Sequence, residues 1–463
     1  MHKKYGPIVR ISPTEVAVSD PEAFKQIHAV SSKFTKDIWY EKLTNFPRLS
    51  VFTMRNPKEH AGRRRLFARG FSKSYLRENW EGVVKDKCRL AVEKIRLDAE
   101  SGTADLLKWW TFMATDIVAR LGFGESFGML ELGQVSVRDP HSISVIDRHL
   151  QKTEYIRILE RALIGNGIGA ELPWLRAILS RVPVKPLQEA FNSSAYILGY
   201  GTKAVENAKK LGEKSNLMAT IMAEAAKEGS NLDDMDVRTE STSLIFAGSG
   251  TTANTLTYLV WTVLSRPSLQ RALEEEVSKV SPDASDADLE QLPLLNATIQ
   301  ETLRLYCAVP GSLPRVAPQG GAQLGGYFIP EGTTCSTQAY TLHRDPAAYE
   351  NPLEYVFLLT MTCKSLTSTR FDPNRYLPDA SPEISKIAKQ TNSAFGAGAY
   401  SCLGIHLAHM ELRFGATYFF QQCRGATLGP TAEADMECEN YFVITPKGKR
   451  CEISLRGEKR YMN

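Results

Sequence analysis

The stretch that most constrains the fold is residues 393–410, SAFGAGAYSCLGIHLAHM, in which Cys402 lies in a glycine-rich turn before an apolar helical run. Gly396 and Gly404 allow the backbone to turn tightly and to approach a flat partner, across which Phe395 can lie. A cysteine at the start of a helix is favoured as a thiolate by the helix dipole and backbone N–H groups. The pattern therefore indicates a sulfur ligand for iron. A buried structural cysteine is the alternative, and it explains a lone Cys-x-Gly better than a motif of this length.

A second informative stretch is residues 239–264, TESTSLIFAGSGTTANTLTYLVWTVL. Its length and apolar character are compatible with a membrane span. The hydroxyl side chains at its middle instead favour a long helix buried in a protein core. Ala247 and Gly248 leave room for a flat group and a small molecule beside the helix. The Thr251 hydroxyl can replace a backbone hydrogen bond and open a local bulge.

Composition limits the class of protein. The chain has 463 residues, 43% of them hydrophobic, and no linker rich in Pro, Gly or Ser divides it, so we expect one large α-rich unit. The net charge of +4 indicates no nucleic-acid partner. The eight cysteines are scattered without a CxxC pair, which argues against a zinc site and a disulfide framework and suits a reducing compartment.

The full motif around the cysteine, F-G-x-G-x-Y-x-C-x-G, resembles that of the cytochrome P-450 family of haem-thiolate monooxygenases. The resemblance implies a mainly α fold with small β-sheets, a single triangular domain over residues 1–463. Haem b would lie between the distal helix (239–264) and the Cys402 loop, with Cys402 as the proximal iron ligand. A thiolate pushes electron density to the iron and favours O–O cleavage. The loop residues implied to contact the haem are Phe395, Gly396, Tyr400 and Gly404.

Two positions depart from the family pattern. The family usually has Arg or His two places before the cysteine, facing a haem propionate, and this chain has Tyr400. The distal helix of the family has an acid before its threonine, and this chain has Gly250 before Thr251. Thr251 keeps the alcohol that holds dioxygen and passes protons to it. Without the acid, protons would arrive by a water chain, by Ser249 or from a substrate hydroxyl.

Basic residues are expected at the propionates. His60 and Arg64 are four residues apart in HAGRRR, so they point to one side of a helix, and the family uses this spacing for the propionates. A solvated basic face is the alternative for such a run. Arg315, in PGSLPRVAP, follows the later helix at the distance where the family places another propionate ligand. With Tyr400 uncharged, we expect His60, Arg64 and Arg315 to neutralise both propionates.

A structural ion cluster is expected behind the cysteine. Glu301 and Arg304 lie at i and i+3 of a helix and so share a face. A lone surface pair of this kind contributes only ~0–1 kcal/mol. With a buried second arginine it becomes a clamp of charge-assisted hydrogen bonds. The family supplies that arginine from a P-x-R stretch, which Arg375 fits, so we predict a structural triad that takes no part in catalysis.

The substrate pocket is predicted to be apolar, which suits a hydrophobic terpenoid, polyketide or indole-derived molecule. A hairpin near the C-terminus is expected from strands at 441–445 and 451–455, with its tip at 446–448, and such a tip often contacts substrate in the family. The predicted pocket residues are Phe246, Ala247, Val309, Leu313 and Phe442.

Partners follow from what the chain lacks. It has no G-x-G-x-x-G strand–turn–helix of its own, so electrons would come from NADPH through a separate flavoprotein, an NADPH–cytochrome reductase. LRLYCAVPGSLPR and YFVITPKGKRCEI resemble filamentous-fungal members that tailor secondary metabolites. Eukaryotic relatives usually carry an N-terminal anchor, whereas this chain starts in domain sequence. We therefore expect the cytosolic face of the endoplasmic reticulum membrane for a longer, anchored form; a soluble relative is the alternative.

Residues 356–370, VFLLTMTCKSLTSTR, interrupt the family pattern. One explanation is a surface loop, because loops tolerate insertions at modest entropic cost. The other is translated intron, since Val codons begin with GT, an Arg codon can begin with AG, and removal leaves NPLEYFDPNRYL. We favour the intron as the hypothesis.

Two rival functions remain open. Gly250 is compatible with a haem-thiolate isomerase or dehydratase, which would turn over a peroxide without NADPH. The insertion and Tyr400 are compatible with a non-catalytic haem binder. The favoured function is a monooxygenase that inserts one oxygen atom from O₂ into a hydrophobic small molecule.

Overall fold

The computed structural model describes residues 1–44, 46–133, 162, 165–211, 216–230, 232–345, 349, 371–379, 391–429 and 433–455. The insertion predicted at 356–370 lies outside them.

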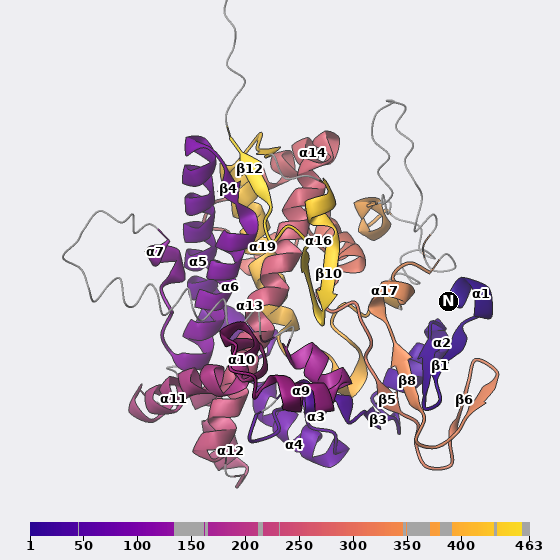
Figure 1. The fold of residues 1–463 in the computed structure, drawn as a ribbon. Helices are drawn as coiled ribbons and strands as arrows, with labels where there is room; N and C mark the ends of the chain where they lie inside the picture. The colour runs from indigo at the N-terminus through magenta and orange to yellow at the C-terminus, as the bar shows by residue number, and fades with distance from the viewer. Residues whose placement is uncertain are drawn as a thin grey trace, which may run out of the picture.

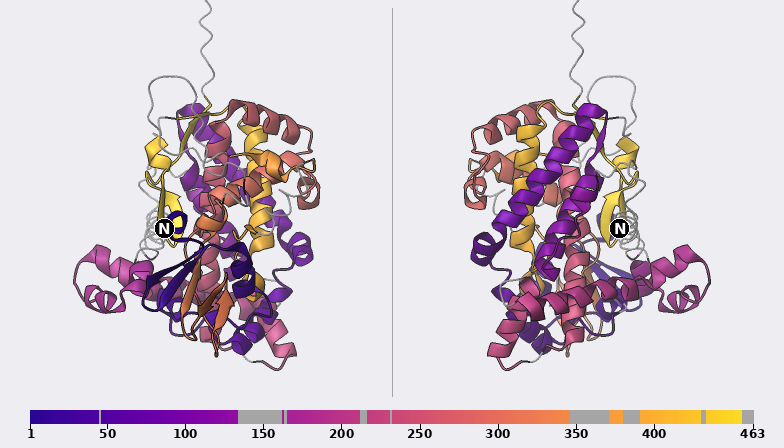
Figure 2. Two further views of the ribbon diagram at one scale, coloured as in Figure 1. Left: turned by 90° about the vertical axis from the view of Figure 1, so that its right-hand side faces the viewer. Right: turned by 90° about the vertical axis from the view of Figure 1, so that its left-hand side faces the viewer.

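Helices dominate the described residues (Figure 1), which confirms the predicted fold class. The long helices α5, α6, α13, α16 and α19 run beside one another, and the largest sheet lies to one side of them. Figure 2 places α9 and α10, in magenta, at an edge of the molecule. None of the described helices is long and apolar enough to cross a membrane. The helices are α1 (His2–Tyr5), α2 (Pro21–His28), α3 (Trp39–Leu43), α4 (Pro57–Ala68), α5 (Lys73–Ser101), α6 (Leu106–Phe123), α7 (Met129–Leu132), α9 (Pro173–Leu179), α10 (Lys185–Phe191), α11 (Ser193–Leu211), α12 (Leu217–Lys227), α13 (Asp234–Leu264), α14 (Pro267–Ser278), α15 (Asp286–Leu289), α16 (Pro293–Leu305), α17 (Ala339–Leu342) and α19 (Ile405–Gln422), with 3-10 turns η1 (Pro373–Tyr376), η2 (Gly398–Tyr400) and η3 (Glu433–Met436).

The strands form small sheets. The largest has the order β1-β2-β8-β5-β3; β4-β12-β9 form a second sheet, and β6-β7 and β10-β11 are two-stranded. Within the largest sheet, β2 and β8 are parallel, whereas β3 and β8 are each antiparallel to β5. The strands are β1 (Ile8–Ser12), β2 (Glu15–Val18), β3 (Thr35–Lys36), β4 (Ala104–Asp105), β5 (Arg315–Val316), β6 (Ala322–Leu324), β7 (Tyr327–Ile329), β8 (Thr334–Thr337), β9 (Thr427–Leu428), β10 (Cys438–Tyr441), β11 (Val443–Pro446) and β12 (Glu452–Ser454).

The helix predicted at 239–264 is α13, and it begins earlier, at Asp234. Asp233 caps it, because its side chain accepts from the Asp236 N–H while the Asp236 carboxylate accepts from the Asp233 N–H. Most of α13 is buried, and it packs against α6, α11 and α19, so it is a core helix. Several of its hydroxyl groups donate to carbonyls one turn earlier in the helix; the Thr255 hydroxyl, for example, donates to the Thr251 carbonyl at 2.8 Å.

The turn before α19 is held by two constraints. The Cys402 N–H donates to the Phe395 carbonyl at 2.8 Å, which closes the loop. Gly398 has φ +63°, and a Cβ there would lie 1.7 Å from the His28 carbonyl oxygen at the end of α2. Only glycine fits this approach, so the loop is fixed against the N-terminal part of the chain.

The hairpin predicted near the C-terminus was wrong in its pairing. β10 pairs with β11 and the chain reverses at Phe442, whereas β12 pairs with β4 and β9. Phe442 has φ +89°, and its N–H donates to the Asn440 side chain at 3.1 Å. The turn therefore lies at Phe442, where an asparagine side chain holds it, and not at the predicted tip, 446–448.

Candidate active site

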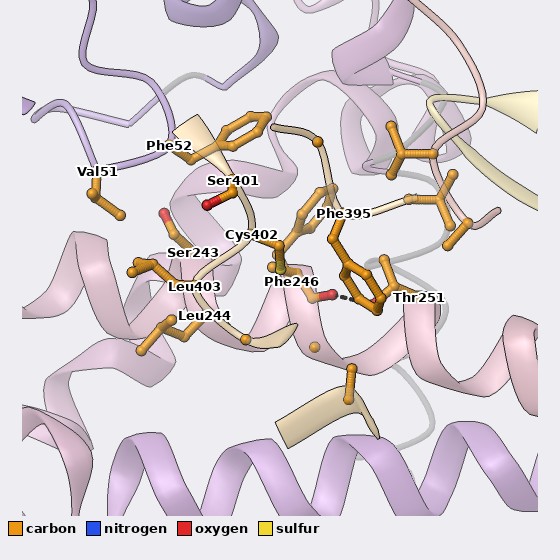
Figure 3. A pocket seen from close by; sticks show the side chains of 18 of the residues that line it. Val51, Phe52, Ser243, Leu244, Phe246, Thr251, Phe395, Ser401, Cys402 and Leu403 are labelled. Carbon is orange, nitrogen blue, oxygen red and sulfur yellow. Dashed lines mark hydrogen bonds between the residues drawn. The ribbon is translucent and has the colours of Figure 1, made fainter. Parts of the chain in front are cut away.

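One cavity lies between α13 and the Cys402 loop (Figure 3). In the figure, Phe395, Ser401 and Cys402 come from the loop, and Ser243, Phe246 and Thr251 come from α13. The structure therefore brings together predicted residues from distant parts of the chain. Those that line the cavity are His60, Arg64, Phe246, Ala247, Thr251, Val309, Leu313, Arg315, Phe395, Gly396, Tyr400, Cys402, Gly404 and Phe442.

Cys402 lines this cavity. Burial raises the pKa of its thiol, although the Gly404 N–H and the Arg64 guanidinium favour the thiolate. Arg64 also fixes the preceding residue, since it donates to the Ser401 carbonyl at 2.7 Å and to the Ser401 hydroxyl at 3.1 Å. A thiol of this kind loses its proton when it binds a metal cation.

The facing wall is α13. The Thr251 hydroxyl lines the cavity and donates to the Ala247 carbonyl at 2.6 Å. Ser249 is fully buried, donates to the Ile245 carbonyl at 2.8 Å and lies off the cavity wall. Gly250 also lies off the wall, and a Cβ there would meet only the Asn254 side chain, at 4.0 Å. Of the three residues predicted for catalysis, the structure places only Thr251 at the cavity.

Cations gather around Tyr400 on another wall. The guanidinium carbon of Arg315 lies 4.9 Å from the Tyr400 ring centroid, and the His60 ring lies 4.6 Å from it. Arg315 is buried and donates to the Tyr40 hydroxyl at 2.7 Å, while its Nε has no hydrogen-bond partner among the described residues. Burial, together with Lys36, Arg64 and Arg315, holds the pKa of His60 at about 3. His60 is therefore a neutral hydrogen-bonding group here, whereas we expected it to share in neutralising charge.

Lys36 was missed by the sequence analysis. It is 3% exposed, and its ammonium lines the cavity 4.8 Å from the Tyr400 ring centroid. Burial is the main cause that lowers its pKa, followed by Arg315 and Arg64. A lone lysine in an aromatic-rich stretch carries no motif, so only the fold could show its place.

Glu411 on α19 was also missed. It is buried at the cavity wall, and its Oε2 has no partner among the described residues. Burial raises its pKa well above the usual range, although a hydrogen bond from Thr252 opposes the shift. The sequence did offer one signal for this residue, a glutamate on the apolar face of the helix that follows the Cys402 loop.

The predicted ion cluster lies apart from the cavity. Arg304 donates from Nε to Glu301 Oε2 at 2.7 Å and from Nη2 to Oε1 at 2.6 Å, and both side chains are fully buried. Arg375 Nε lies 3.7 Å from Glu301 Oε1. Arg304 also donates to the His343 carbonyl, and His343 Nε2 accepts from the Ser393 N–H, each at 2.8 Å. The cluster is therefore connected to the start of the Cys402 loop.

Aromatic side chains close the cavity above. Phe442, at the hairpin turn, has its ring centroid 5.7 Å from that of Trp39 and 6.0 Å from that of Phe52. Tyr40 packs against Phe52 at 5.4 Å. Tyr40, Phe52 and Phe442 line the cavity and give a hydrophobic molecule an apolar surface to bind.

The residues present fit haem b. A cysteine sulfur at the wall offers an iron ligand, and two buried cations, Lys36 and Arg315, lie beside Arg64 where carboxylates would be needed. Glu240 also lines the cavity, but it is held by Arg63 at 3.0 Å and by the Val51 N–H at 2.9 Å. The positive charge at this wall thus exceeds what the protein's own carboxylates balance, as two propionates require.

Comparison with known proteins agrees with the family resemblance found in the sequence. A family model described as Cytochrome P450 matches residues 1–358 and 367–453. The cytochrome P450 monooxygenase stcB of Emericella nidulans is 38% identical over 98% of this chain and 82% of its own length. The cytochrome P450 monooxygenase cypX of Dothistroma septosporum is 37% identical over 98% and 85%. The crystal structure of the cytochrome P450DA heme domain has a TM-score of 0.74 at 16% identity, covering 98% of this chain and 90% of that one, which supports the fold. This chain belongs to the cytochrome P450 family of haem-thiolate monooxygenases.

Proposed function

We propose that Cys402 is the proximal ligand of haem b and that the Thr251 hydroxyl, on the opposite side of the haem, binds dioxygen and passes protons to it. When bound, the haem supplies activation of O₂ and transfer of one oxygen atom to a C–H bond or alkene. The observation that carries this proposal is that the Cys402 sulfur and the Thr251 hydroxyl line one cavity with an excess of cations at its wall. Arg64, His60 and Arg315 would bind the propionates, while Phe395, Gly396, Tyr400 and Gly404 would surround the macrocycle.

Proton supply must differ from the family pattern at Gly250. Ser249 gives little support, because its hydroxyl is committed to a carbonyl away from the cavity. Glu411 is the better candidate, since it lines the cavity, burial raises its pKa and so favours the protonated acid, and Thr252 joins it to α13. Exchange of Glu411 for Gln should raise the NADPH consumed per product formed, while Glu439→Gln, in the exposed β10 strand, serves as the control. Unchanged coupling in Glu411→Gln would leave water or substrate as the proton donor.

The substrate is a hydrophobic small molecule. The rings of Tyr40, Phe52 and Phe442 and the apolar side chains Phe246, Val309 and Leu313 line the cavity and support this class. The curated relatives come from filamentous fungi. We place the reaction in fungal secondary metabolism, on a terpenoid, polyketide or indole-derived molecule.

Electrons would reach the haem from NADPH through a separate NADPH–cytochrome reductase, because the sequence has no dinucleotide-binding motif of its own. We propose that the chain receives these electrons at the membrane of the endoplasmic reticulum. Contact with that membrane would come through a membrane anchor or through the surface of the domain. Support by reductase with NADPH, compared with support by a hydroperoxide alone, separates a monooxygenase from the isomerase or dehydratase that Gly250 also allows.

The decisive experiment is the spectrum of the reduced carbon-monoxide complex. We expect a thiolate-type Soret band from the chain and its loss in Cys402→Ser. Cys438→Ser is the matched control, because Cys438 lies on β10 outside the cavity lining. A thiolate band that persists in Cys402→Ser would overturn the proposal.

We also propose one domain over residues 1–463, with 356–370 as retained intron. The family model skips residues 359–366, which all fall inside this segment, and this supports the proposal. Transcripts sequenced across the junction should lack the segment, and deletion of 356–370 should increase the haem content of purified protein. Abundant message that retains the segment, with no gain on deletion, would identify it as a tolerated surface loop.

A further inference from the structure

Lys36 occupies a place where a lysine is costly. Its side chain is 3% exposed at the end of β3, and lysines are almost never fully buried without a partner charge. In β3 and β5, Lys36 is the direct cross-strand partner of Arg315, which is also 3% exposed. Like charges opposite one another destabilise an antiparallel pair. Two buried cations in register therefore point to an anion that both would bind.

The polar contacts of these two side chains leave donors available. Lys36 Nζ donates to the Val51 carbonyl at 3.2 Å and to the Phe52 carbonyl at 2.6 Å, and an ammonium has three donors. Arg315 Nε has no hydrogen-bond partner in the described part of the chain. The two carbonyls orient the ammonium but do not neutralise it. Both cations thus reach the cavity with unused hydrogen-bonding capacity.

The protein's own acids do not explain Lys36. Burial and repulsion by Arg315 and Arg64 lower the pKa of Lys36, and they outweigh the attraction of Glu240, which raises it. The Glu240 carboxylate is already bound by Arg63, at 3.0 Å. A purely structural role, in which Lys36 only ties down residues 51–52, would be served by an uncharged donor at lower cost.

Tyr400 connects these cations. Lys36 Nζ lies 4.8 Å from one aromatic centroid, that of Tyr400, and the Arg315 guanidinium carbon lies 4.9 Å from the same centroid. An aromatic face attracts cations, so one ring holds both. An arginine at position 400 would instead add a further positive charge beside them. An uncharged residue at position 400 therefore avoids the repulsion that an arginine there would exert on Lys36.

We propose that Lys36 is a propionate-binding residue that supplies the positive charge missing at Tyr400, with the Tyr400 ring as the surface on which Lys36 and Arg315 are held. The inference rests on the proposed haem site. Lys36 and Arg315 then act together on the carboxylates, and Arg64 acts between them and the Cys402 loop, as its hydrogen bonds to Ser401 indicate. Lys36 is a positioning residue for the cofactor and takes no part in the reaction itself.

The test is a charge-relocation cycle on the haem-loaded full chain. The variants are Lys36→Gln, which keeps a donor for the two carbonyls but removes the charge, Tyr400→Arg, and the double variant. Lys33→Gln is the matched control, since Lys33 is exposed in the same segment. The readouts are the rate of haem transfer to excess apomyoglobin and the ferric/ferrous midpoint potential, with the reduced carbon-monoxide spectrum as a check on the thiolate.

We expect Lys36→Gln to speed haem loss about tenfold or more, the effect of removing a charged hydrogen-bond partner, and to lower the midpoint potential, because less positive charge remains near the iron. Lys33→Gln should match the wild type. Tyr400→Arg alone should not slow haem loss, whereas adding it to Lys36→Gln should restore retention most of the way. If Lys36 were only structural, Tyr400→Arg would have the same effect on haem loss with and without the lysine.

Haem loss from Lys36→Gln at the control rate, or a double variant no better than Lys36→Gln, would overturn the inference. If Lys36→Gln fails to fold, Lys36→Arg decides, because an arginine that retains haem as well as the wild type supports a charge role and one that loses it contradicts that role. A wild-type chain without a thiolate band would refute the proposed function instead. A normal band with no effect at Lys36 would refute only this inference.

Discussion

The buried pair Glu301–Arg304 allows a quantitative prediction of what holds the cysteine loop in place. Glu301 Oε1 accepts from Arg304 Nη2 at 2.6 Å and from the Asp372 N–H at 2.8 Å, and it lies 3.7 Å from Arg375 Nε. Glu301 Oε2 accepts from Arg304 Nε at 2.7 Å. The change Glu301→Gln keeps the shape of the side chain but removes its charge and turns an N–H₂ group toward a guanidinium.

Because both members of the pair are fully buried, the remaining arginine cannot recover its solvation from water. Removing one partner of a buried ion pair typically costs 3–5 kcal/mol, so we expect Glu301→Gln to lower the free energy of unfolding by about that amount. Lys279→Met is the control, since the Lys279–Glu275 pair also joins residues one helical turn apart, at i,i+4 rather than i,i+3, but its side chains are 69% and 71% exposed. Exposed i,i+4 pairs contribute only about 0.3–0.5 kcal/mol.

The assay is urea denaturation of the haem-loaded protein, followed both by far-ultraviolet circular dichroism and by the thiolate band of the reduced carbon-monoxide complex. Arg304 binds the His343 carbonyl and His343 Nε2 accepts from Ser393, so the thiolate band should be lost at a lower urea concentration than the helical signal in Glu301→Gln. If Glu301→Gln is no less stable than Lys279→Met, the clamp does not stabilise the fold and the reasoning fails.

Three further changes test local features. Gly398→Ala should abolish stable haem binding, because its Cβ would overlap the His28 carbonyl. Gly62→Ala, in open space on α4, should instead raise the free energy of unfolding by about 0.5–1 kcal/mol. Equal haem content in the two variants would contradict this. Gly250→Asp should fold normally, since a Cβ there meets no closer atom than 4.0 Å, and product formed per NADPH should rise if proton supply limits the wild type. Burial raises the pKa of Glu240 from 4.5 to about 7, so the native state binds its proton more tightly than the unfolded chain. Its contribution to stability is therefore full below 4.5 and lost as the pH rises through 7, and Glu240→Gln should remove this part of the pH dependence of unfolding.

Features set by short-range spacing could be predicted from the sequence. His60 and Arg64 lie on one side of α4 and Glu301 contacts Arg304 on α16, because helix geometry fixes neighbours at i+3 and i+4. The Cys402 loop could be predicted because its glycines meet local demands, such as the positive φ at Gly396.

Features set by long-range pairing could not be predicted. The turn at Phe442 has no glycine, and it is held by Asn440 and by contact with Trp39 and Phe52 from a distant segment. Ser249 has a suitable hydroxyl at a suitable position in the sequence, but the rotation of α13 turns it into the core. In both cases the tertiary neighbours decided the outcome, and a single sequence does not contain them in readable form.

In our proposal, Lys36 and Arg315 preserve the electrostatics of a motif whose own charged residue has changed to Tyr400. The charge that the family usually places two residues before the cysteine sets the electrostatic potential near the haem propionates. A cation on any other segment that reaches this place can have the same effect. β3 reaches it because β5 pairs with it and sets Lys36 opposite Arg315. The cost of that pairing, two like charges in register under low exposure, is acceptable only where anions bind, and it is reduced by the shared Tyr400 ring. If Lys36 binds a propionate as we propose, the tyrosine two places before the cysteine does not weaken the cofactor site, because the displaced charge is carried by β3.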